Sequence, residues 1–231
     1  GKARMIFLNK ADLADDQATL AWMDYFRKKG ITPIRLDARK TNFKKAVVDG
    51  VKIACQEKIE RDRRKGILNR PIRAMIVGIP NVGKSTFINS FAGKACTKTG
   101  NKPGVTKGKQ WIRLNKMEEL LDTPGILWPK FEDQEVGLRL AYIGSIKDEL
   151  YNIYELSVLL LQYLRENYPN AVSNFYGIAE EKTSEETLKQ IAEKRGCLKA
   201  GGEFDLDKAA KCLIDDFRAG KLGAISLEMP Q

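Results

Sequence analysis

The chain has 231 residues, of which 43% are hydrophobic, so it can form one large domain or two smaller ones around a buried core. Its 40 lysine and arginine residues exceed its 30 acidic residues, and the net charge of +10 favours a polyanionic partner such as ribosomal RNA, although many soluble proteins are basic without binding RNA. No stretch is apolar enough for a membrane span or a secretory segment, and four scattered cysteines without any histidine argue against a zinc site, so we expect a cytoplasmic monomer with reduced thiols.

The first part of the chain alternates short apolar runs with helical patterns, which is typical of a parallel α/β sheet. The expected elements are, in order, a strand at 4–8, a helix at 17–29, a strand at 31–36 and a helix at 43–59. Gly30 ends the first helix, and Asn42 is the predicted N-cap of the second. The inner face of that second helix is predicted to carry Val47, Val48, Val51 and Ala54.

A polar, basic stretch follows at residues 60–70, where Gly66 and the later Pro71 argue against one uninterrupted helix. We interpret it as a connector whose charges form a solvated face rather than an RNA contact. Beyond it, the expected elements are a buried strand at 74–77, a helix at 84–92, and a hairpin of strands at 110–114 and 119–121 around an Asn115-Lys116 turn.

After about residue 133 the strand signal disappears. The expected elements are an amphipathic segment at 136–146 and helices at 151–168, 184–194 and 206–218, with Pro169 ending the first of these helices and Gly201-Gly202 forming a turn. Residues at helical spacing should form the core, namely Leu156, Leu159, Leu160, Tyr163 and Leu164. We therefore predict an α/β domain over residues 1–148 and an all-helical domain over residues 149–231.

Residues 78–85, GIPNVGKS, match a phosphate-binding P-loop between a predicted strand and a predicted helix. A glycine at each end lets the backbone curl around phosphate oxygens, and successive amides with the helix N-terminus make a positive cradle. We predict that Lys84 reaches the β- and γ-phosphates and that the Ser85 hydroxyl ligates Mg²⁺. The residues predicted to line the cradle are Asn81, Val82, Gly83, Lys84, Ser85 and Thr86.

Asp122 ends an apolar strand and begins Asp-Thr-Pro-Gly. In a P-loop enzyme an aspartate at this place holds the magnesium shell, and the amide of Gly125 can meet the γ-phosphate. Asp-x-x-Gly alone is common and more often forms a turn, but its place one hairpin after the P-loop helix favours the functional interpretation.

Thr106 lies in the polar segment between the P-loop helix and the hairpin. A threonine there can ligate magnesium when GTP is bound and release it after hydrolysis, which would make the segment an order–disorder switch. It could also be an ordinary loop threonine, and Thr97 and Thr99 compete for the role. Together with Lys84 and Gly125, Thr106 is a candidate catalytic residue.

Asn9-Lys10-Ala11-Asp12 matches the guanine-recognition element NKxD. Asp12 can accept hydrogen bonds from the N1 and N2 hydrogens of guanine, a donor pair that adenine lacks. Asn9 is expected to steady the site, and the stem of Lys10 to cover a face of the base. In the Asp37-Ala38 turn, a backbone amide is placed to touch the guanine O6.

The base-reading element precedes the phosphate cradle, whereas in ordinary GTPases it follows about a hundred residues later. This inversion predicts a GTP site on a chain whose connections are circularly permuted. The order NKAD, LDAR, GIPNVGKS, PGVT and DTPG resembles the circularly permuted GTPases, and DTPGILWPK with the later EKRGCL narrows the resemblance to bacterial members that act in assembly of the large ribosomal subunit. The resemblance covers essentially the whole chain.

The resemblance implies a P-loop GTPase fold with a mostly parallel, circularly permuted sheet and a C-terminal helical RNA-binding domain. It implies hydrolysis of GTP to GDP and phosphate, and binding of the large ribosomal subunit precursor through its rRNA. The cofactors so implied are GTP or GDP, Mg²⁺, and K⁺ beside Asn81, where it would add positive charge near the phosphates.

Two departures from the family pattern bear on catalysis. Ile126 follows the Asp-x-x-Gly motif where many GTPases carry a water-orienting glutamine, and the histidine that the family is thought to use near its N-terminus is absent here. Members also insert a strand from upstream of NKxD between the P-loop strand and the NKxD strand, yet only eight residues precede Asn9. We therefore expect that an upstream segment is missing and that this chain binds GTP but turns it over slowly.

Three functions remain open at this point. The leading one is a GTPase that times a step in ribosome assembly; its rival is an RNA-binding module with a structural nucleotide, and multiple-turnover phosphate release with and without large subunits separates the two. A signalling switch with a protein partner fits the +10 charge less well. The basic residues that could face RNA, or could simply be solvated, are Lys189, Lys194, Arg195, Lys199, Lys208, Lys211, Arg218 and Lys221.

Overall fold

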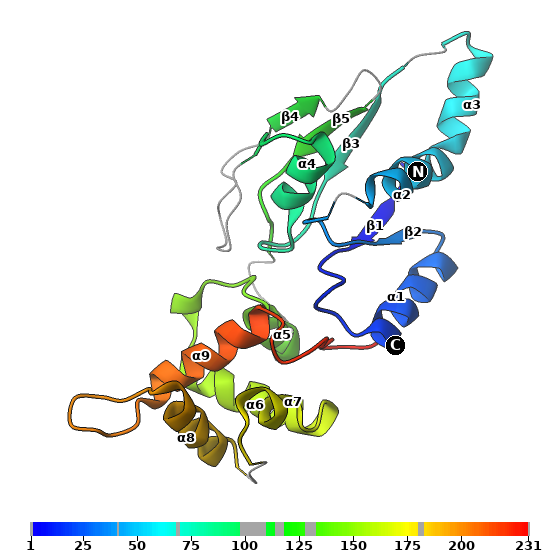
Figure 1. Cartoon of the computed structure of the whole chain (residues 1–231). Helices are drawn as coiled ribbons and strands as arrows, with labels where there is room; N and C mark the ends of the chain where they lie inside the picture. Colours follow the sequence, from blue (N-terminus) through cyan, green and yellow to red (C-terminus); the bar gives the residue numbers. More distant parts are fainter. Residues whose placement is uncertain are drawn as a thin grey trace. The chain divides into compact units, whose positions relative to one another are not determined.

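The computed structural model describes residues 2–40, 42–67, 70–97, 110–113, 118–127, 133–179 and 183–230. It divides into two units, one formed by residues 1–129 with 228–231 and the other by residues 130–227. The first unit carries the strands with their flanking helices, and the second is helical (Figure 1). None of the helices in the described part of the chain combines the length and the apolar character that crossing a bilayer requires.

The first sheet pairs β1 (Met5–Leu8) in parallel with β2 (Thr32–Arg35). Between them runs α1 (Asp16–Lys28), which begins where the Asp15 side chain accepts a hydrogen bond from the Ala18 amide. The next helix, α2 (Lys44–Ala54), packs against both strands. The predicted strand–helix–strand order of this region is confirmed, with bounds shifted by a residue or so.

The predicted helix over 43–59 is instead two helices, α2 and then α3 (Gln56–Arg64), which meet at Cys55. Beyond the junction the sequence is almost wholly polar, so α3 has no apolar face with which to continue along the sheet. The prediction of Asn42 as N-cap was wrong, because Phe43 takes the cap position and buries its ring in the core. The polar stretch is helical up to Arg64 and ends its helix before Gly66, as expected.

The second sheet has the strand order β3-β5-β4. In it β3 (Ile72–Ile76) runs parallel to β5 (Glu118–Asp122), and β4 (Gln110–Arg113) is antiparallel to β5. The predicted hairpin is confirmed, while its turn lies outside the described residues. The described strands thus form two small sheets, not one, and two of their three pairings are parallel.

The strand β3 was expected to be buried, but its residues alternate between half-buried and exposed positions. Met75 is 60% exposed and Val77 is 61% exposed. The other face is covered, because α4 (Lys84–Ala92) packs against the neighbouring strand β5. A continuous apolar run therefore marked a strand with a single covered face.

An aromatic cluster joins the two sheets of this unit. Phe87 of α4 lies 4.8 Å from Phe7 of β1 and 5.3 Å from Phe43, measured between ring centroids. Phe87 and Phe43 are each 4% exposed and belong to one core with Ile34 and Ile112. The packing of α4 on both sheets holds the two halves of the unit together without a shared strand.

The helical unit surrounds a second core. Its elements are α5 (Gln134–Tyr142), a 3₁₀ turn η1 (Asp148–Leu150), α6 (Ile153–Asn167), α7 (Ala171–Tyr176), α8 (Ser184–Arg195) and α9 (Leu206–Arg218). The short helix α7 has no counterpart among the predicted elements. Leu160, Leu188 and Leu213, from three different helices, are fully buried at the centre of this core.

The unit boundary near residue 129 precedes the predicted domain boundary at residue 148. The difference arises from α5, because Ala141 and Tyr142 are buried in the helical core. Arg218 of α9 reinforces this packing by donating hydrogen bonds to the carbonyls of Ala141, at 2.8 Å, and Tyr142, at 3.0 Å. An amphipathic pattern alone did not reveal which core the segment joins.

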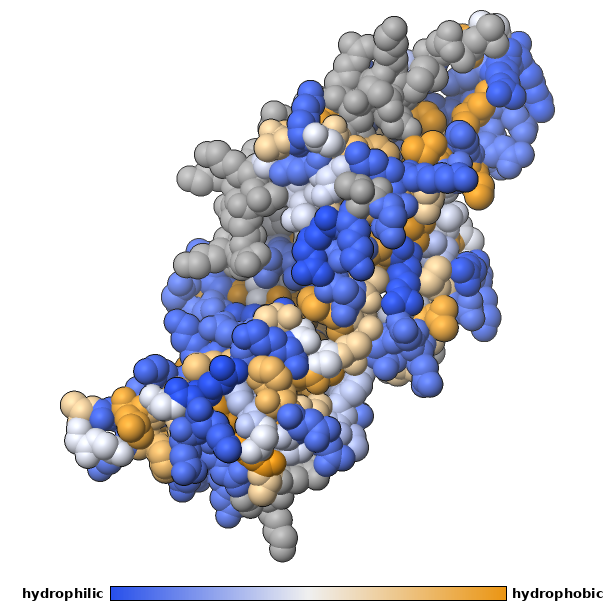
Figure 2. Space-filling view, viewed as in Figure 1, coloured by the Kyte–Doolittle hydropathy of each residue, from blue (hydrophilic) through white to orange (hydrophobic). Residues whose placement is uncertain are grey.

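Hydrophilic residues cover most of the face shown in Figure 2, with hydrophobic residues scattered among them. Leu159, predicted to belong to the core, is 44% exposed. The buried arc of α6 is set by Leu156, Leu160, Leu161 and Leu164, and Leu159 falls at its margin. An adjacent position on a helix is turned by about 100°, which is enough to move Leu159 out of the core.

Asp216 of α9 connects three segments of the helical unit. It is 6% exposed and accepts hydrogen bonds from Tyr176 at 2.8 Å, Arg195 at 2.6 Å and Lys221 at 2.7 Å. Burial alone would raise the pKa of Asp216, but the bonds from Lys221 and Tyr176 outweigh it and hold the pKa below its usual range. The carboxylate is therefore charged at neutral pH and compensated by its donors.

We expect Asp216→Ala to lower the free energy of unfolding by about 1–3 kcal/mol at neutral pH, because the buried Tyr176 hydroxyl would lose its acceptor while the partly exposed Arg195 and Lys221 would turn to solvent. The exposed neighbour Asp215 gives the control Asp215→Ala, which should change little. The depressed pKa of Asp216 makes its contribution full above about pH 4 and lost as the pH falls further. Urea unfolding followed by circular dichroism should therefore show wild type and variant converging in acid; an equal gap at all pH values would contradict this.

Candidate functional site

The P-loop connects β3 to α4 through backbone conformations that few residues adopt. Gly83 has φ of +92° and Asn81 has φ of +60°. Gly83 is the N-cap of α4 and leaves the helix without a side-chain cap. The first amides of a helix lack partners within the helix and carry the positive end of its dipole. The start of α4 is therefore suited to an anion.

Lys84 turns its ammonium group back into this loop. Its Nζ donates hydrogen bonds to the carbonyl oxygens of Gly78, at 3.1 Å, and Ile79, at 2.8 Å. Burial lowers the pKa of Lys84, and the nearby carboxylate of Asp122 opposes that change. Its acceptors are neutral carbonyls, so an anionic group in the loop would be a stronger partner.

Asp122 ends β5 at the edge of the same loop. It is 1% exposed, and neither of its carboxylate oxygens has a hydrogen-bond partner among the described residues. Burial raises the pKa of Asp122, while the charge of Lys84 and the neighbouring backbone amide of Thr123 act in the opposite direction. A buried carboxylate without donors is costly unless a cation compensates it.

The segment after Asp122 lies directly against the P-loop. The Thr123 hydroxyl donates to the Ile76 carbonyl at 2.6 Å, and the Ile126 amide donates to the Gly78 carbonyl at 3.2 Å. A Cβ on Gly125 would lie 2.6 Å from the Cα of Pro80, so this close approach requires glycine. The side chain of Ile126 is 68% exposed.

Asn9, which follows β1, joins two loops that are distant in the sequence. Its Nδ2 donates to the Val82 carbonyl at 2.8 Å, and its Oδ1 accepts from the Ala38 amide at 2.9 Å. A Cβ on Gly83 would lie only 2.3 Å from the Asn9 Nδ2, so the glycine also makes room for this contact. The P-loop, the loop after β1 and the loop after β2 therefore meet at one side chain.

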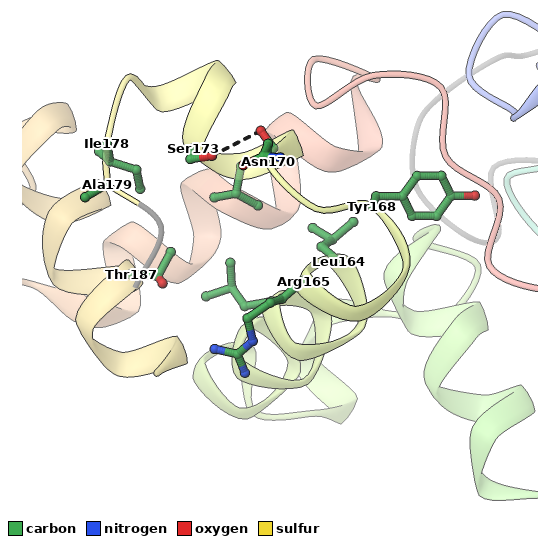
Figure 3. Close-up of a pocket in the computed structure, with 10 residues that line it drawn as sticks. Leu164, Arg165, Tyr168, Asn170, Ser173, Ile178, Ala179 and Thr187 are labelled. Carbon is green, nitrogen blue, oxygen red and sulfur yellow. Dashed lines mark hydrogen bonds between the residues drawn. The ribbon is translucent and has the colours of Figure 1, made fainter. Parts of the chain in front are cut away.

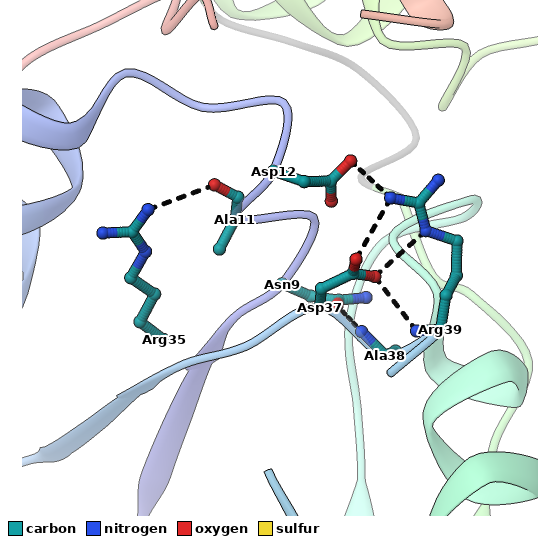
Figure 4. Close-up of polar contacts among 7 residues, drawn as sticks. All are labelled: Asn9, Ala11, Asp12, Arg35, Asp37, Ala38 and Arg39. Atoms are coloured by element: carbon teal, nitrogen blue, oxygen red, sulfur yellow. Dashed lines mark hydrogen bonds and ion pairs between the residues drawn. The ribbon is translucent and has the colours of Figure 1, made fainter. Parts of the chain in front are cut away.

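The loop after β1 turns sharply at Lys10, which has φ of +57°. The Ala11 amide then donates to the Leu36 carbonyl at 3.1 Å, which fixes this loop beside the loop after β2. Asp12 projects beyond this turn (Figure 4), with a side chain that is 23% exposed. In this structure the Ala38 amide donates to Asn9. Its predicted contact with a guanine O6 stays a prediction.

Arg39 is the last residue of the LDAR string, and the sequence assigned no role to its side chain. Its guanidinium forms ion pairs with both Asp12 and Asp37 (Figure 4). The hydrogen bond from Arg39 lowers the pKa of Asp37, so that carboxylate is charged at neutral pH. The position of an arginine two residues after one acidic residue was the available signal, but its pairing with Asp12 depends on how the two loops meet.

The structure also bears on the threonines proposed as a switch. The Thr97 hydroxyl donates to the Ser85 carbonyl and to the Asn89 Oδ1, each at 3.2 Å, so it closes the loop after α4. Thr99 and Thr106 lie outside the described residues. Thr86 is half-buried in the first turn of α4.

A pocket in the helical unit has a different character (Figure 3). It lies among α6, α7 and the start of α8, with Leu164 and Ile178 among its apolar lining. Ser173 donates to the Asn170 carbonyl at 3.2 Å, and Arg165 is the one charged residue among the described residues that line it. This lining offers no group of side chains suited to chemistry, so the loops around Asn9 are the candidate site.

Residues 73–194 match the family model described as 50S ribosome-binding GTPase. Ribosome biogenesis GTPase A of Bacillus cereus is 46% identical over 231 residues, which cover all of this chain and 78% of that protein. The protein of the same name from Thermotoga maritima is 33% identical over 233 residues, covering 100% of this chain and 78% of its own length.

Two solved structures of YlqF are similar to this chain. GNP-bound YlqF from T. maritima superposes with a TM-score of 0.66 at 29% identity, covering 98% of this chain and 82% of that one. A GDP-bound YlqF structure gives a TM-score of 0.65 at 28% identity, with coverage of 98% and 83%. Given this identity over its full length, the chain belongs to the ribosome biogenesis GTPase A family.

Proposed function

We propose that the loops at 9–12, 36–39, 78–85 and 122–125 form a single site for GTP and GDP. In this proposal the chain hydrolyses GTP during maturation of the large ribosomal subunit. Its family is one of 50S ribosome-binding GTPases, and the related structures described above are GDP-bound and GNP-bound. The observation that carries the proposal is a pair of hydrogen bonds at Asn9, which donates to the Val82 carbonyl and accepts from the Ala38 amide, and so joins the phosphate-binding loop to the base-reading loops.

At the phosphate end, the proposal assigns the cradle to the amides from Asn81 to Thr86 and to the ammonium group of Lys84. The uncapped start of α4 supports this assignment, as do the neutral acceptors that Lys84 has in this structure. The proximity of Gly125 to Pro80 supports a contact of its amide with the terminal phosphate.

A divalent cation fits the donors at this end. The two oxygens of the buried Asp122, which have no hydrogen-bond partner in the described part of the chain, are hard ligands of the kind that Mg²⁺ binds, and Ser85 stands at the start of α4. We assign Mg²⁺ to Ser85, Asp122 and Thr106, where it would neutralise charge on the phosphates. A K⁺ ion beside Asn81 is supported by the sequence resemblance.

At the base end, Asp12 would accept the N1 and N2 hydrogens of guanine, with Asn9 holding the loop and Lys10 beside the base. This end of the site comes from residues that precede the P-loop, and the family model match begins only at residue 73. We therefore propose that the fold is circularly permuted and that residues 60–70 form its new connection.

The helical unit is the proposed RNA-binding part. Of its eight basic candidates, four are engaged with acidic partners: Lys189 with Glu185, Arg195 and Lys221 with Asp216, and Arg218 with Asp148. The exposed lysines that remain as the better candidates are Lys194, Lys199, Lys208 and Lys211. The net charge of +10 supports binding to rRNA, which would fall steeply as salt is raised.

Asp12→Asn should reverse the base preference from guanosine to xanthosine nucleotides. An asparagine can donate to the C2 carbonyl of xanthine, whereas it no longer accepts both guanine hydrogens; each mispairing should weaken binding by about 5- to 150-fold. Calorimetric titration of GDP and XDP tests this, with Asp16→Asn as the control because the exposed Asp16 pairs with Arg35. Unchanged preference for guanine would refute the assignment of Asp12.

Asp122→Asn should stabilise the magnesium-free chain by about 1–3 kcal/mol, because it removes a buried charge to which no described residue donates a hydrogen bond. The same variant should lose the gain in GTP affinity that Mg²⁺ brings to the wild type. Urea unfolding without Mg²⁺ and GTP titration across Mg²⁺ concentrations measure the two effects. The exposed Asp49 provides the control Asp49→Asn, and a variant with a wild-type response to Mg²⁺ would exclude Asp122 from the metal site.

A further inference from the structure

Arg39 is bonded to the carboxylate of Asp12, which in the proposed site accepts the hydrogens of guanine. Its Nη2 bonds to Oδ2 of Asp12, while its Nε and Nη2 bond to Asp37 at 3.0 and 3.1 Å (Figure 4). Its own amide also donates to Asp37 Oδ1 at 3.0 Å. The guanidinium thus spans two carboxylates from the loops after β1 and β2.

The guanidinium and the edge of guanine offer similar chemistry to a carboxylate. Each is planar and presents adjacent N–H donors that point in the same direction. Asp12 is proposed to accept two such donors from the base, and one of its oxygens already accepts from Arg39. The arginine and the base therefore require the same acceptor.

We propose that Arg39 is an internal competitor for guanine, which holds Asp12 until the base replaces it. The inference rests on the proposed nucleotide site. Asp37 determines what happens to the displaced side chain, because it retains the Nε, Nη2 and backbone bonds of Arg39 when the bond to Asp12 is given up. Arg39 then stays paired beside the base.

The exposure of the three side chains determines how strongly Arg39 is expected to lower the affinity for the base. The side chains are 65% exposed for Arg39, 23% for Asp12 and 9% for Asp37. An ion pair this exposed is weak, so its displacement should cost roughly 1.5- to fivefold in affinity for the base. The competition therefore tunes binding without preventing it.

The opposite role would be a positioning one, in which Arg39 keeps Asp12 aimed at the base. The two roles predict opposite effects on guanine affinity when Arg39 is removed. A competitor weakens guanine binding, so its removal tightens binding; a positioning residue strengthens it, so its removal loosens binding. The dependence on salt distinguishes competition from a structural effect. Salt screens the exposed Arg39–Asp12 ion pair of the wild type, so it should weaken the competition there, whereas a variant without Arg39 has no such pair to screen.

The test is calorimetric titration of GDP into the full chain carrying Arg39→Ala or Arg39→Gln, over a series of salt concentrations. Arg35→Ala is the matched control, because Arg35 bonds to the Ala11 carbonyl and to Asp16 in the same region but not to Asp12. We expect either Arg39 variant to bind GDP about 1.5- to fivefold more tightly than the wild type at low salt, with the difference closing as salt rises. Arg35→Ala should match the wild type.

Equal or weaker binding by both Arg39 variants would overturn the inference, and so would a gain that persists unchanged at high salt. A wild-type chain that fails to bind GDP would refute the proposed nucleotide site instead, so the two failures can be told apart. Glutamine keeps much of the side-chain length and provides the second variant if alanine disturbs the loop.

Discussion

The hydrogen bonds of one amide side chain hold the site together. Asn9 gives one bond to the P-loop at Val82 and receives one from the loop after β2 at Ala38. Both partners are backbone groups, so the contact fixes the paths of two loops rather than the positions of two side chains. The contact requires a glycine at position 83, where any Cβ would collide with the amide.

This local contact is supported from beneath by the aromatic core. The ring of Phe87 on the P-loop helix lies against Phe7 of β1 and against Phe43, so the helix that forms the phosphate cradle also packs on the sheet that carries the base-reading loops. The two small sheets share no strand pairing among the described residues, so this packing and the contacts of Asn9 together hold the distant sequence segments beside each other.

The two cationic groups of the site, on Lys84 and Arg39, are bonded to the protein itself. Lys84 donates to carbonyls of its own loop, and Arg39 donates to Asp12. A ligand with phosphates and a guanine edge offers better partners to both ends, so its binding would exchange weak internal contacts for stronger ones. Asp122 differs because it has no donor in the described part of the chain and so matches a cation.

The sequence predicted the parts of the fold that local pattern determines. The strands at β1, β2 and β5, the helix after the P-loop and the helices α6, α8 and α9 follow from apolar periodicity and turn residues. The errors have tertiary causes: the break at Cys55 comes where packing on the sheet ends, and Leu159 lies just outside the buried arc of α6.

Residues of the candidate site were predictable where a motif fixes their spacing, as for the P-loop and NKxD. The contacts between motifs were not. That Asn9 reaches Val82, and that Arg39 reaches Asp12, depends on the packing of loops separated in sequence. The local pattern of residues predicts neither contact.

The most direct test of the account is GDP affinity in Asn9→Ala. The variant loses both bonds that join the loops, so we expect affinity to fall by about 5- to 150-fold, while Asn42→Ala, which alters an exposed asparagine, leaves it unchanged. An Asn9→Ala chain that is folded and binds GDP as tightly as the wild type would contradict the claim that this side chain assembles the site.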